Sequence, residues 1–234
     1  HPVESITELT CPMVAITTHG VGPKVLAELH SRSSGIVDTT CPWVKRAQRA
    51  AQRLAAAGFA VLILGDTGHP EVKGVLEWAG EGSRATDGKD IENLYAEFPR
   101  RLGILSQTTQ NPQAFSDFVK IVTDRFMPYG IELRAINTIC DATQKRQSAA
   151  IELAETVDVM IVVGGKGSAN TRRLAEICSA HGVATHLIET ARELDPGWFR
   201  GKQHVGVTAG ASTPDEAIRE VFNGLHYMKV GAQC

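Results

Sequence analysis

Short apolar runs alternate along the chain with longer segments in which apolar residues recur at helical spacing. Six runs are rich in apolar residues, at 13–17, 60–64, 102–105, 157–163, 184–188 and 205–208. Several are apolar throughout, which is typical of strands buried on both faces of a parallel sheet. Helical spacing is present between them, at 44–57, 112–125, 144–155 and 171–180. This rhythm predicts βαβ units and therefore an α/β fold.

An internal repeat organises the chain. Segment 38–48 matches segment 137–147, so that Cys140 is equivalent to Cys41 and lies 99 residues after it. At the same offset of 99 residues, the loop 65–69 aligns with 164–168. The stretches 103–112 and 206–214 also resemble each other. One repeat unit therefore contains a cysteine loop, a glycine loop and a hydroxyl-rich loop, each predicted at the carboxyl end of a strand.

The opening stretch 15–23 resembles the hydroxyl-rich loop of one more unit. We therefore expect the chain to start partway through the first of three units, with a remnant at 1–40, a second unit at 41–138 and a third at 139–234. The expected fold is a pseudo-threefold arrangement of small parallel-sheet α/β units around a central site, with the first unit incomplete. Because ligands gather at the carboxyl ends of parallel strands, the loops would face one cavity.

Charge and cysteine usage exclude several classes of protein. Lys and Arg number 24 against 26 Asp and Glu, which argues against nucleic acid as a partner. The apolar runs are too short to span a membrane. The five cysteines include no Cys-x-x-Cys pair, so we expect reduced thiols in a cytosolic compartment.

Cys41 and Cys140 are the candidate metal ligands. Each directly precedes a predicted helix, where a thiolate is electrostatically favoured and suited to bind metal, as in iron–sulfur clusters. The alternative is a pair of buried structural cysteines. Cys11, Cys178 and Cys234 have no partner in the repeat, and Cys178 and Cys234 are expected to be structural or incidental.

The other loops contain side chains suited to proton transfer and anion binding. Glu71 could supply protons and His69 could donate a hydrogen bond, although Glu71 is also an ordinary first-turn helix residue. The remaining candidates are polar loop residues that could instead be helix caps or locally satisfied side chains: His19, Thr108, Ser168, Asn170 and Ser212. Capping and phosphate binding use the same exposed helix start, so the two roles are compatible.

These stretches, taken together, resemble the 4-hydroxy-3-methylbut-2-enyl diphosphate reductases, the LytB family. The resemblance rests on seven stretches that run in family order from about residue 5 to residue 225, namely those around His19, Cys41, His69 with Glu71, Thr108, Cys140, Ser168 with Asn170, and Ser212. It implies reductive removal of an allylic hydroxyl to give isopentenyl and dimethylallyl diphosphates. This reaction is the last step of the non-mevalonate isoprenoid pathway.

The resemblance also implies a cofactor, partners and residue roles. Cys41 and Cys140 would hold a [4Fe-4S] cluster, Glu71 would deliver a proton, and Thr108 would position it. The diphosphate or the substrate chain would be bound by His19, His69, Thr108, Ser168, Asn170 and Ser212. Ferredoxin or flavodoxin would supply two electrons. The expected compartment is the bacterial cytoplasm or the plastid stroma.

Two features depart from the family pattern. The family's first cysteine and an early histidine are absent from this chain, so the third cysteine ligand of the cluster is expected in a preceding segment of about 50 to 60 residues. Ala169 also stands where some members have a second serine. An alternative is therefore a degenerate homologue that binds an isoprenyl diphosphate without catalysis, and a second is an unrelated α/β sugar- or nucleotide-binding protein.

Overall fold

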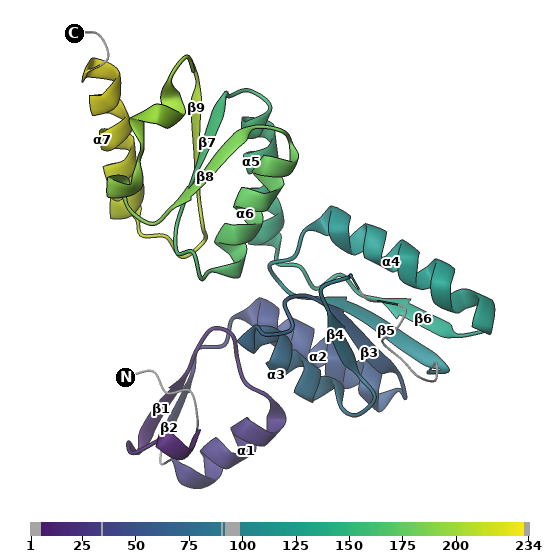
Figure 1. Cartoon of the computed structure of the whole chain (residues 1–234). Helices are drawn as coiled ribbons and strands as arrows, with labels where there is room; N and C mark the ends of the chain where they lie inside the picture. Colours follow the sequence, from purple (N-terminus) through teal and green to yellow (C-terminus); the bar gives the residue numbers. More distant parts are fainter. Residues whose placement is uncertain (1–5, 34, 90, 92–98, 232–234) are drawn as a thin grey trace. The chain divides into compact units, whose positions relative to one another are not determined.

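The computed structural model describes residues 6–33, 35–89, 91 and 99–231. It divides the chain into two compact units, His1–Ile139 and Cys140–Cys234, each built from parallel strands joined by helices (Figure 1). The predicted α/β class with small parallel sheets is confirmed. The finer division at residues 40 and 138 stays a prediction.

The first unit contains two sheets. In the smaller one, β1 (Met13–Ile16) pairs in parallel with β2 (Gly35–Asp38), and α1 (Pro23–Arg32) connects them. The larger sheet has the order β4-β3-β5-β6. Its strands are β3 (Ala60–Leu64), β4 (Arg84–Thr86), β5 (Arg101–Ser106) and β6 (Glu132–Ala135), and the helices beside it are α2 (Pro42–Ala56), α3 (Pro70–Ala79) and α4 (Pro112–Phe126). The described residues also form four short 3-10 helices. η1 (Ile6–Glu8) and η2 (Met127–Tyr129) belong to the first unit, and η3 (Ala191–Glu193) and η4 (Pro196–Phe199) belong to the second.

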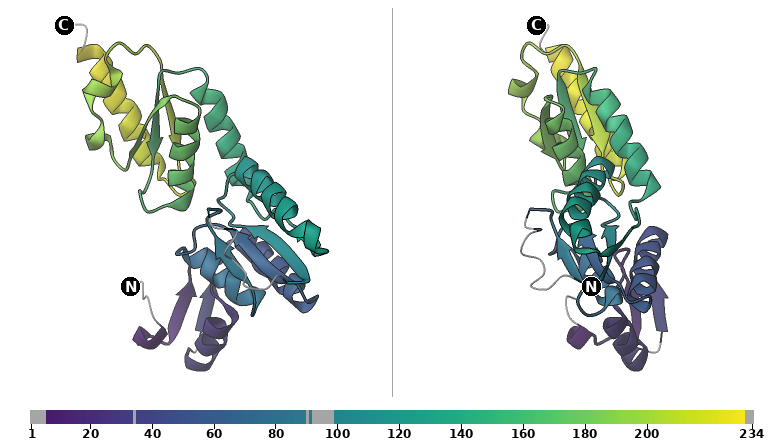
Figure 2. Two further views of the ribbon diagram at one scale, coloured as in Figure 1. Left: turned by 45° about the vertical axis from the view of Figure 1, so that its right-hand side comes forward. Right: turned by 90° about the vertical axis from the view of Figure 1, so that its right-hand side faces the viewer.

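Side chains alternate between the two faces of the larger sheet, as the pleat of a strand requires. Val61 and Ile63 of β3 pack with α2 and α3, whereas Leu62 and Leu64 pack with α4 on the opposite face. Figure 2 shows these helices on either side of the sheet. Burial on both faces explains why this strand is apolar throughout.

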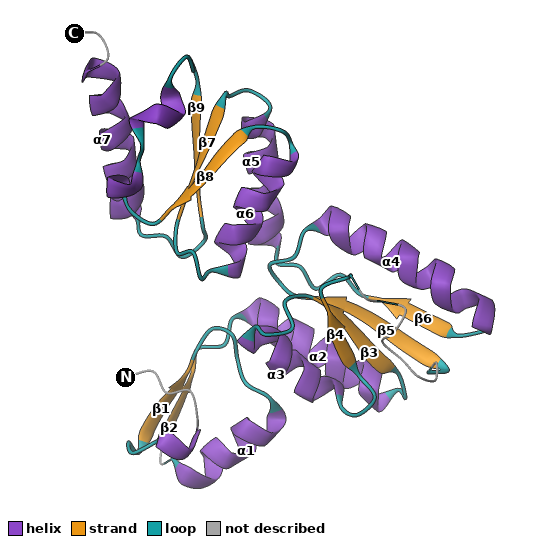
Figure 3. Ribbon diagram, in the orientation of Figure 1, coloured by secondary structure: helices purple, strands orange, loops and turns teal. Residues whose placement is uncertain are grey.

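The second unit repeats this construction with three strands. β7 (Val159–Val163) lies between β8 (Ala184–Ile188) and β9 (Val205–Ala209), and all three are parallel. Met160 and Val162 pack with α5 (Asp141–Ala154) and α6 (Ala169–Ala180), while Ile161 and Val163 pack on the side of α7 (Asp215–Gly231) (Figure 3).

The sequence-based boundaries need corrections. The predicted helices at 44–57, 144–155 and 171–180 begin at Pro42, Asp141 and Ala169 instead, because each starts directly after a capping residue. The predicted strand at 157–163 begins at Val159. No helix in the described part of the chain combines the length and the apolar character needed to cross a bilayer.

Candidate active site

The loops that follow β3 and β5 lie side by side because the two strands are parallel neighbours. The Asp66 backbone N–H donates to Gln107 Oε1 at 3.0 Å, and the Gln107 N–H donates to the Leu64 carbonyl at 2.8 Å. Gly65 permits this close approach, because a Cβ there would lie 2.8 Å from the Gln107 Cβ. The predicted glycine loop and the predicted hydroxyl-rich loop therefore meet at the carboxyl edge of the sheet.

Glu71 is a buried acid held by Thr108 across these two loops. The Thr108 N–H donates to Glu71 Oε1 at 2.7 Å, and the Thr108 hydroxyl donates to Oε2 at 2.8 Å. Only 2% of the Glu71 surface is exposed. Burial raises the pKa of this carboxyl above its ordinary 4.5, against the opposing effect of the two hydrogen bonds from Thr108. The site thus favours a carboxylic acid that keeps its proton at a higher pH than usual.

Two histidines lie beside this acid. His69 caps the start of α3, and its Nδ1 accepts the Glu71 backbone N–H at 3.2 Å. The His19 ring packs edge-on against the His69 ring, with a centroid separation of 4.9 Å. The loop of His19 is anchored at the Val21 carbonyl, which accepts the Trp78 indole N–H at 3.0 Å. The first unit therefore brings together four of the predicted site residues: His19, His69, Glu71 and Thr108.

Cys41 and Cys140 occupy equivalent loops with equivalent hydrogen bonds. Before Cys41, Asp38 Oδ1 accepts the Thr40 N–H at 2.9 Å, and before Cys140, Asn137 Oδ1 accepts the Ile139 N–H at 2.9 Å. In each loop the threonine after the Asx residue donates its hydroxyl to a carbonyl at the end of a neighbouring strand, Thr39 to Ile16 and Thr138 to Ser106. The repeat in the sequence is thus present in the local geometry.

Both cysteines are available as ligands. Each is the N-cap of its helix, is half-buried and free of a disulfide, and uses no side-chain hydrogen bond to cap the helix. A helix N-terminus favours a bound thiolate. This donor chemistry fits an iron–sulfur centre. Within the described ranges, however, no three His, Cys, Asp or Glu side chains gather into a metal-binding group. Cys41 belongs to the first unit and Cys140 to the second, so a shared cluster stays a prediction.

The second unit has its own glycine loop, which leads into α6. Ser168 caps this helix by accepting the Thr171 N–H at 3.4 Å. Asn170 is 7% exposed, and neither its amide nitrogen nor its amide oxygen has a hydrogen-bond partner among the residues that the structure describes. A buried polar group without a protein partner is uncommon, and its donor and acceptor are available to a ligand. The start of α6 therefore offers a helix N-terminus and an unused buried amide to an anion.

The loop of Ser212 lies against this glycine loop. The Thr213 hydroxyl donates to the Val163 carbonyl at 3.0 Å, and a Cβ on Gly164, whose φ is +144°, would lie 2.6 Å from the Thr213 Oγ1. Ser212 is exposed in this loop. Lys166 donates its ammonium to Glu193 and its backbone N–H to Glu189, so this lysine is already paired.

The structure also places residues to which sequence reasoning gave no role. Gln107 is 4% exposed, and its Nε2 has no partner among the described residues. In the sequence, the feature that could have marked Gln107 as a site residue is its position between Ser106 and Thr108 in the hydroxyl-rich loop. Cys11 is exposed and Cys178 is buried in the α5–α6 core, where burial raises the pKa of its thiol. Cys234 lies outside the described residues.

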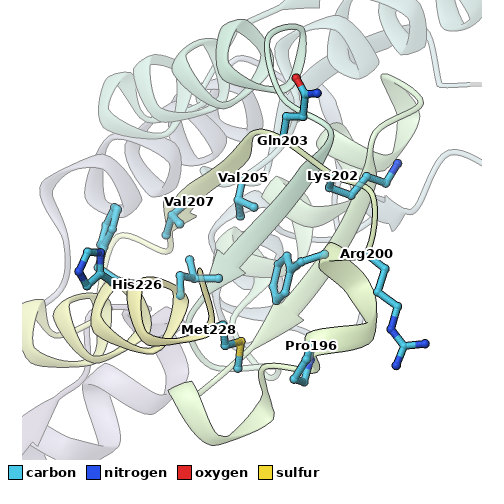
Figure 4. Close-up of a pocket in the computed structure, with 11 residues that line it drawn as sticks. Pro196, Arg200, Lys202, Gln203, Val205, Val207, His226 and Met228 are labelled. Atoms are coloured by element: carbon cyan, nitrogen blue, oxygen red, sulfur yellow. The ribbon is translucent and has the colours of Figure 1, made fainter. Parts of the chain in front are cut away.

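One hollow of about 610 Å³ lies apart from these loops, between β9, η4 and α7 (Figure 4). It contains none of the predicted site residues. Apolar side chains dominate its lining, among them Phe199, Val205, Val207, Phe222, Leu225 and Met228. We call this feature the β9 hollow and do not include it in the candidate site.

Comparisons with known proteins agree with the resemblance. The family model described as LytB protein matches residues 2–226. A 4-hydroxy-3-methylbut-2-enyl diphosphate reductase from Dehalococcoides mccartyi is 48% identical over 98% of this chain and 81% of that protein. A protein of the same name from Geobacter metallireducens is 44% identical over 95% of this chain and 77% of that protein.

Two solved structures are also similar. One is (E)-4-hydroxy-3-methyl-but-2-enyl diphosphate reductase, the terminal enzyme of the non-mevalonate pathway; it is 39% identical, with a TM-score of 0.62 over 95% of this chain and 79% of that one. The other is the E-1-hydroxy-2-methyl-but-2-enyl-4-diphosphate reductase from Plasmodium falciparum. It is 24% identical, with a TM-score of 0.84 over 94% of this chain and 70% of that one, and supports the fold alone.

Proposed function

The chain belongs to the LytB family, and on that basis we propose that it is a 4-hydroxy-3-methylbut-2-enyl diphosphate reductase. The reaction removes the allylic hydroxyl with two electrons and two protons. It releases water and gives isopentenyl or dimethylallyl diphosphate. The observation that carries the proposal is the buried Glu71, whose pKa is raised by burial, held by Thr108 at the edge of the sheet.

A [4Fe-4S] cluster with Cys41 and Cys140 among its ligands is part of this proposal. When bound, such a cluster supplies electrons and Lewis acidity. Cys11 and Cys178 are less suited to hold such a cluster, because Cys11 lies in an exposed segment before β1 and Cys178 is enclosed in the core. The two helix N-caps are the better-suited ligands.

Glu71 holds the proton that converts the departing hydroxyl into water. A general acid must stay protonated at the working pH, and burial of this carboxyl favours that form. Thr108 fixes both carboxyl oxygens, which orients the acid. The neighbouring rings of His19 and His69 can donate hydrogen bonds to the substrate from the same edge.

Neutral donors bind the diphosphate in this proposal. Asn170 contributes its unused amide, Ser168 its hydroxyl at the helix start, and Ser212 a hydroxyl from the adjoining loop. Lys166 is paired with Glu193, and the proposal assigns it no contact with the diphosphate. Helix N-termini and uncharged donors are sufficient to bind phosphate groups.

Anaerobic preparation with iron and sulfide, followed by turnover with reduced methyl viologen, tests the function. We expect the protein to bind iron and sulfide and to convert 4-hydroxy-3-methylbut-2-enyl diphosphate to the two products. A colourless protein that binds diphosphate and releases no product would instead support the non-catalytic homologue.

The unused amide of Asn170 leads to a prediction about affinity. Replacing Asn170 with alanine should raise the KM for the substrate by roughly 10- to 100-fold, because a hydrogen bond to a charged group contributes about 1.5–3 kcal/mol. The fold should be unaffected, since this amide bonds to no described residue. Steady-state kinetics and competition by inorganic diphosphate measure the effect.

A matched control is available in the same unit. Asp195 caps η4 by accepting the Gly197 N–H at 2.7 Å, so Asp195→Ala should lower stability by about 1 kcal/mol and leave KM unchanged. A normal KM in Asn170→Ala would remove Asn170 from the diphosphate site.

A further inference from the structure

Helix α2 differs from every other helix in its charge. It contains Lys45 and three arginines but no acidic residue, whereas each of the six other α-helices contains at least one Asp or Glu. The whole chain has slightly more acidic than basic residues, at 26 against 24. The positive charge on α2 is therefore a local feature of this helix and does not follow from the overall composition.

The three arginines form one exposed stripe. Arg46, Arg49 and Arg53 are spaced i, i+3 and i+7 and fall within roughly 60° of the helix circumference. All three are exposed, while the opposite side of α2 is buried against β3 and α3. We call these residues the α2 arginine stripe.

Among the described residues, no acidic side chain neutralises the charge of this stripe. Lys45 pairs with Asp38 at 2.6 Å, but no Asp or Glu in the described part of the chain forms an ion pair with Arg46, Arg49 or Arg53. The Arg46 guanidinium lies over the Trp43 ring, 5.0 Å from its centroid, which holds this side chain near the start of the helix. An uncompensated stripe of arginines on a nearly neutral protein is suited to an acidic partner.

The stripe begins close to a proposed cluster ligand. Cys41 is the N-cap of α2, and the three arginines follow it by 5, 8 and 12 residues, or roughly 8 to 18 Å along the helix axis. The proposed reaction consumes two electrons per substrate molecule, and these must come from an external donor. A donor bound at this helix would be close to the Cys41 end of the site.

We propose that the α2 arginine stripe docks an acidic ferredoxin that donates the electrons. The proposal rests on the proposed function and names the surface by which that enzyme receives its electrons. Two ferredoxins are oxidised by one electron each, and the substrate loses its hydroxyl as water after taking up two electrons and two protons. Complementary charge mainly raises the association rate of such a pair and makes it dependent on salt.

A second group of exposed cations provides the matched control. Arg200 and Lys202 line the β9 hollow (Figure 4). They precede the first residue of β9, whereas the Ser212 loop follows its last residue. The third cation, Arg219, lies on α7. Replacing these three with glutamine changes the net charge by the same amount as replacing the α2 arginine stripe. The two triple variants therefore separate a local docking effect from a general charge effect.

The experiment compares two reductants and one binding measurement. In the Arg46→Gln/Arg49→Gln/Arg53→Gln variant, kcat/KM for reduced acidic ferredoxin should fall at least ~10-fold at low ionic strength, and its salt dependence should flatten. Turnover with reduced methyl viologen should stay within about twofold of wild type. Titration with oxidised ferredoxin should show the same loss of affinity without any turnover. Replacement of the three arginines with lysine should restore most of the rate.

Several results would overturn the docking surface. These are an unchanged ferredoxin rate, an equal loss with both reductants, or an equal loss in the Arg200/Lys202/Arg219 control. Binding of wild type to anionic phospholipid vesicles, lost in the stripe variant while ferredoxin kinetics stay normal, would assign the stripe to a membrane instead. Absence of turnover with either reductant in wild type would refute the proposed function, while the ferredoxin titration would still test the docking surface.

Discussion

Replacing Cys140 with serine is expected to prevent assembly of the iron–sulfur cluster and to lower kcat by at least ~100-fold. Mutating residues that only surround metal ligands already lowers metal affinity or activity by roughly 10- to 100-fold, and loss of a ligand should cost more. A serine hydroxyl is a far weaker iron ligand than a thiolate, because it stays protonated at neutral pH. Cys41→Ser should have the same effect, because the two cysteines are N-caps of equivalent helices preceded by equivalent Asx turns. Iron and sulfide analysis, together with visible absorption, measures the loss.

Cys11 is the control for these variants. It is exposed, lies in front of β1 and has no equivalent in the repeat. Cys11→Ser should therefore keep the iron content and the turnover of wild type. A Cys140→Ser protein with a full complement of iron would contradict the assignment of Cys140 as a ligand.

Replacing Glu71 with glutamine is expected to lower kcat by at least ~100-fold while the cluster stays intact. Glutamine has nearly the same shape and can keep hydrogen bonds to both the N–H and the hydroxyl of Thr108, but it has no proton to transfer. Rapid-quench product analysis beside iron determination separates a defect in proton transfer from a defect in assembly. Unchanged turnover would exclude Glu71 as the acid.

The same variant should alter how stability depends on pH. In wild type the folded state holds the Glu71 proton more tightly than the unfolded state, because burial raises the pKa above 4.5. The stabilising contribution of this protonation is therefore present below about pH 4.5 and is lost as pH rises toward the raised folded value. Glu71→Gln should not lose stability over this pH range. Its midpoint of unfolding in urea should therefore exceed that of wild type at a pH near the raised pKa of Glu71.

Burial explains which strands could be predicted from the sequence. β3 and β7 lie at the centres of their sheets, and their residues are apolar on both faces because helices cover both. The strands that sequence reasoning missed are short and lie at sheet edges. β2, β4 and β6 have only three or four residues and are partly polar, so neither the apolar run nor a clean alternation marks them.

The candidate site residues that the sequence indicates most clearly are those within the internal repeat. Cys41 and Cys140 are equivalent in sequence and again in their caps and Asx turns. Glu71 and Thr108 are 37 residues apart, and only the parallel pairing of β3 with β5 brings them into contact. Gln107 is marked in the sequence only by its place between Ser106 and Thr108, and its buried Nε2, without a partner among the described residues, is apparent only in three dimensions.

The central claim is that Cys41 and Cys140 bind one inorganic centre, and thiol labelling before and after cluster removal tests it most directly. Iodoacetamide followed by mass spectrometry should find both thiols protected in the iron-loaded protein and both modified, in parallel, once chelator has removed the iron. Exposed Cys11 should react in both states, and buried Cys178 in neither. If either Cys41 or Cys140 reacted equally fast with and without iron, that result would contradict the binding of both thiols to one inorganic centre.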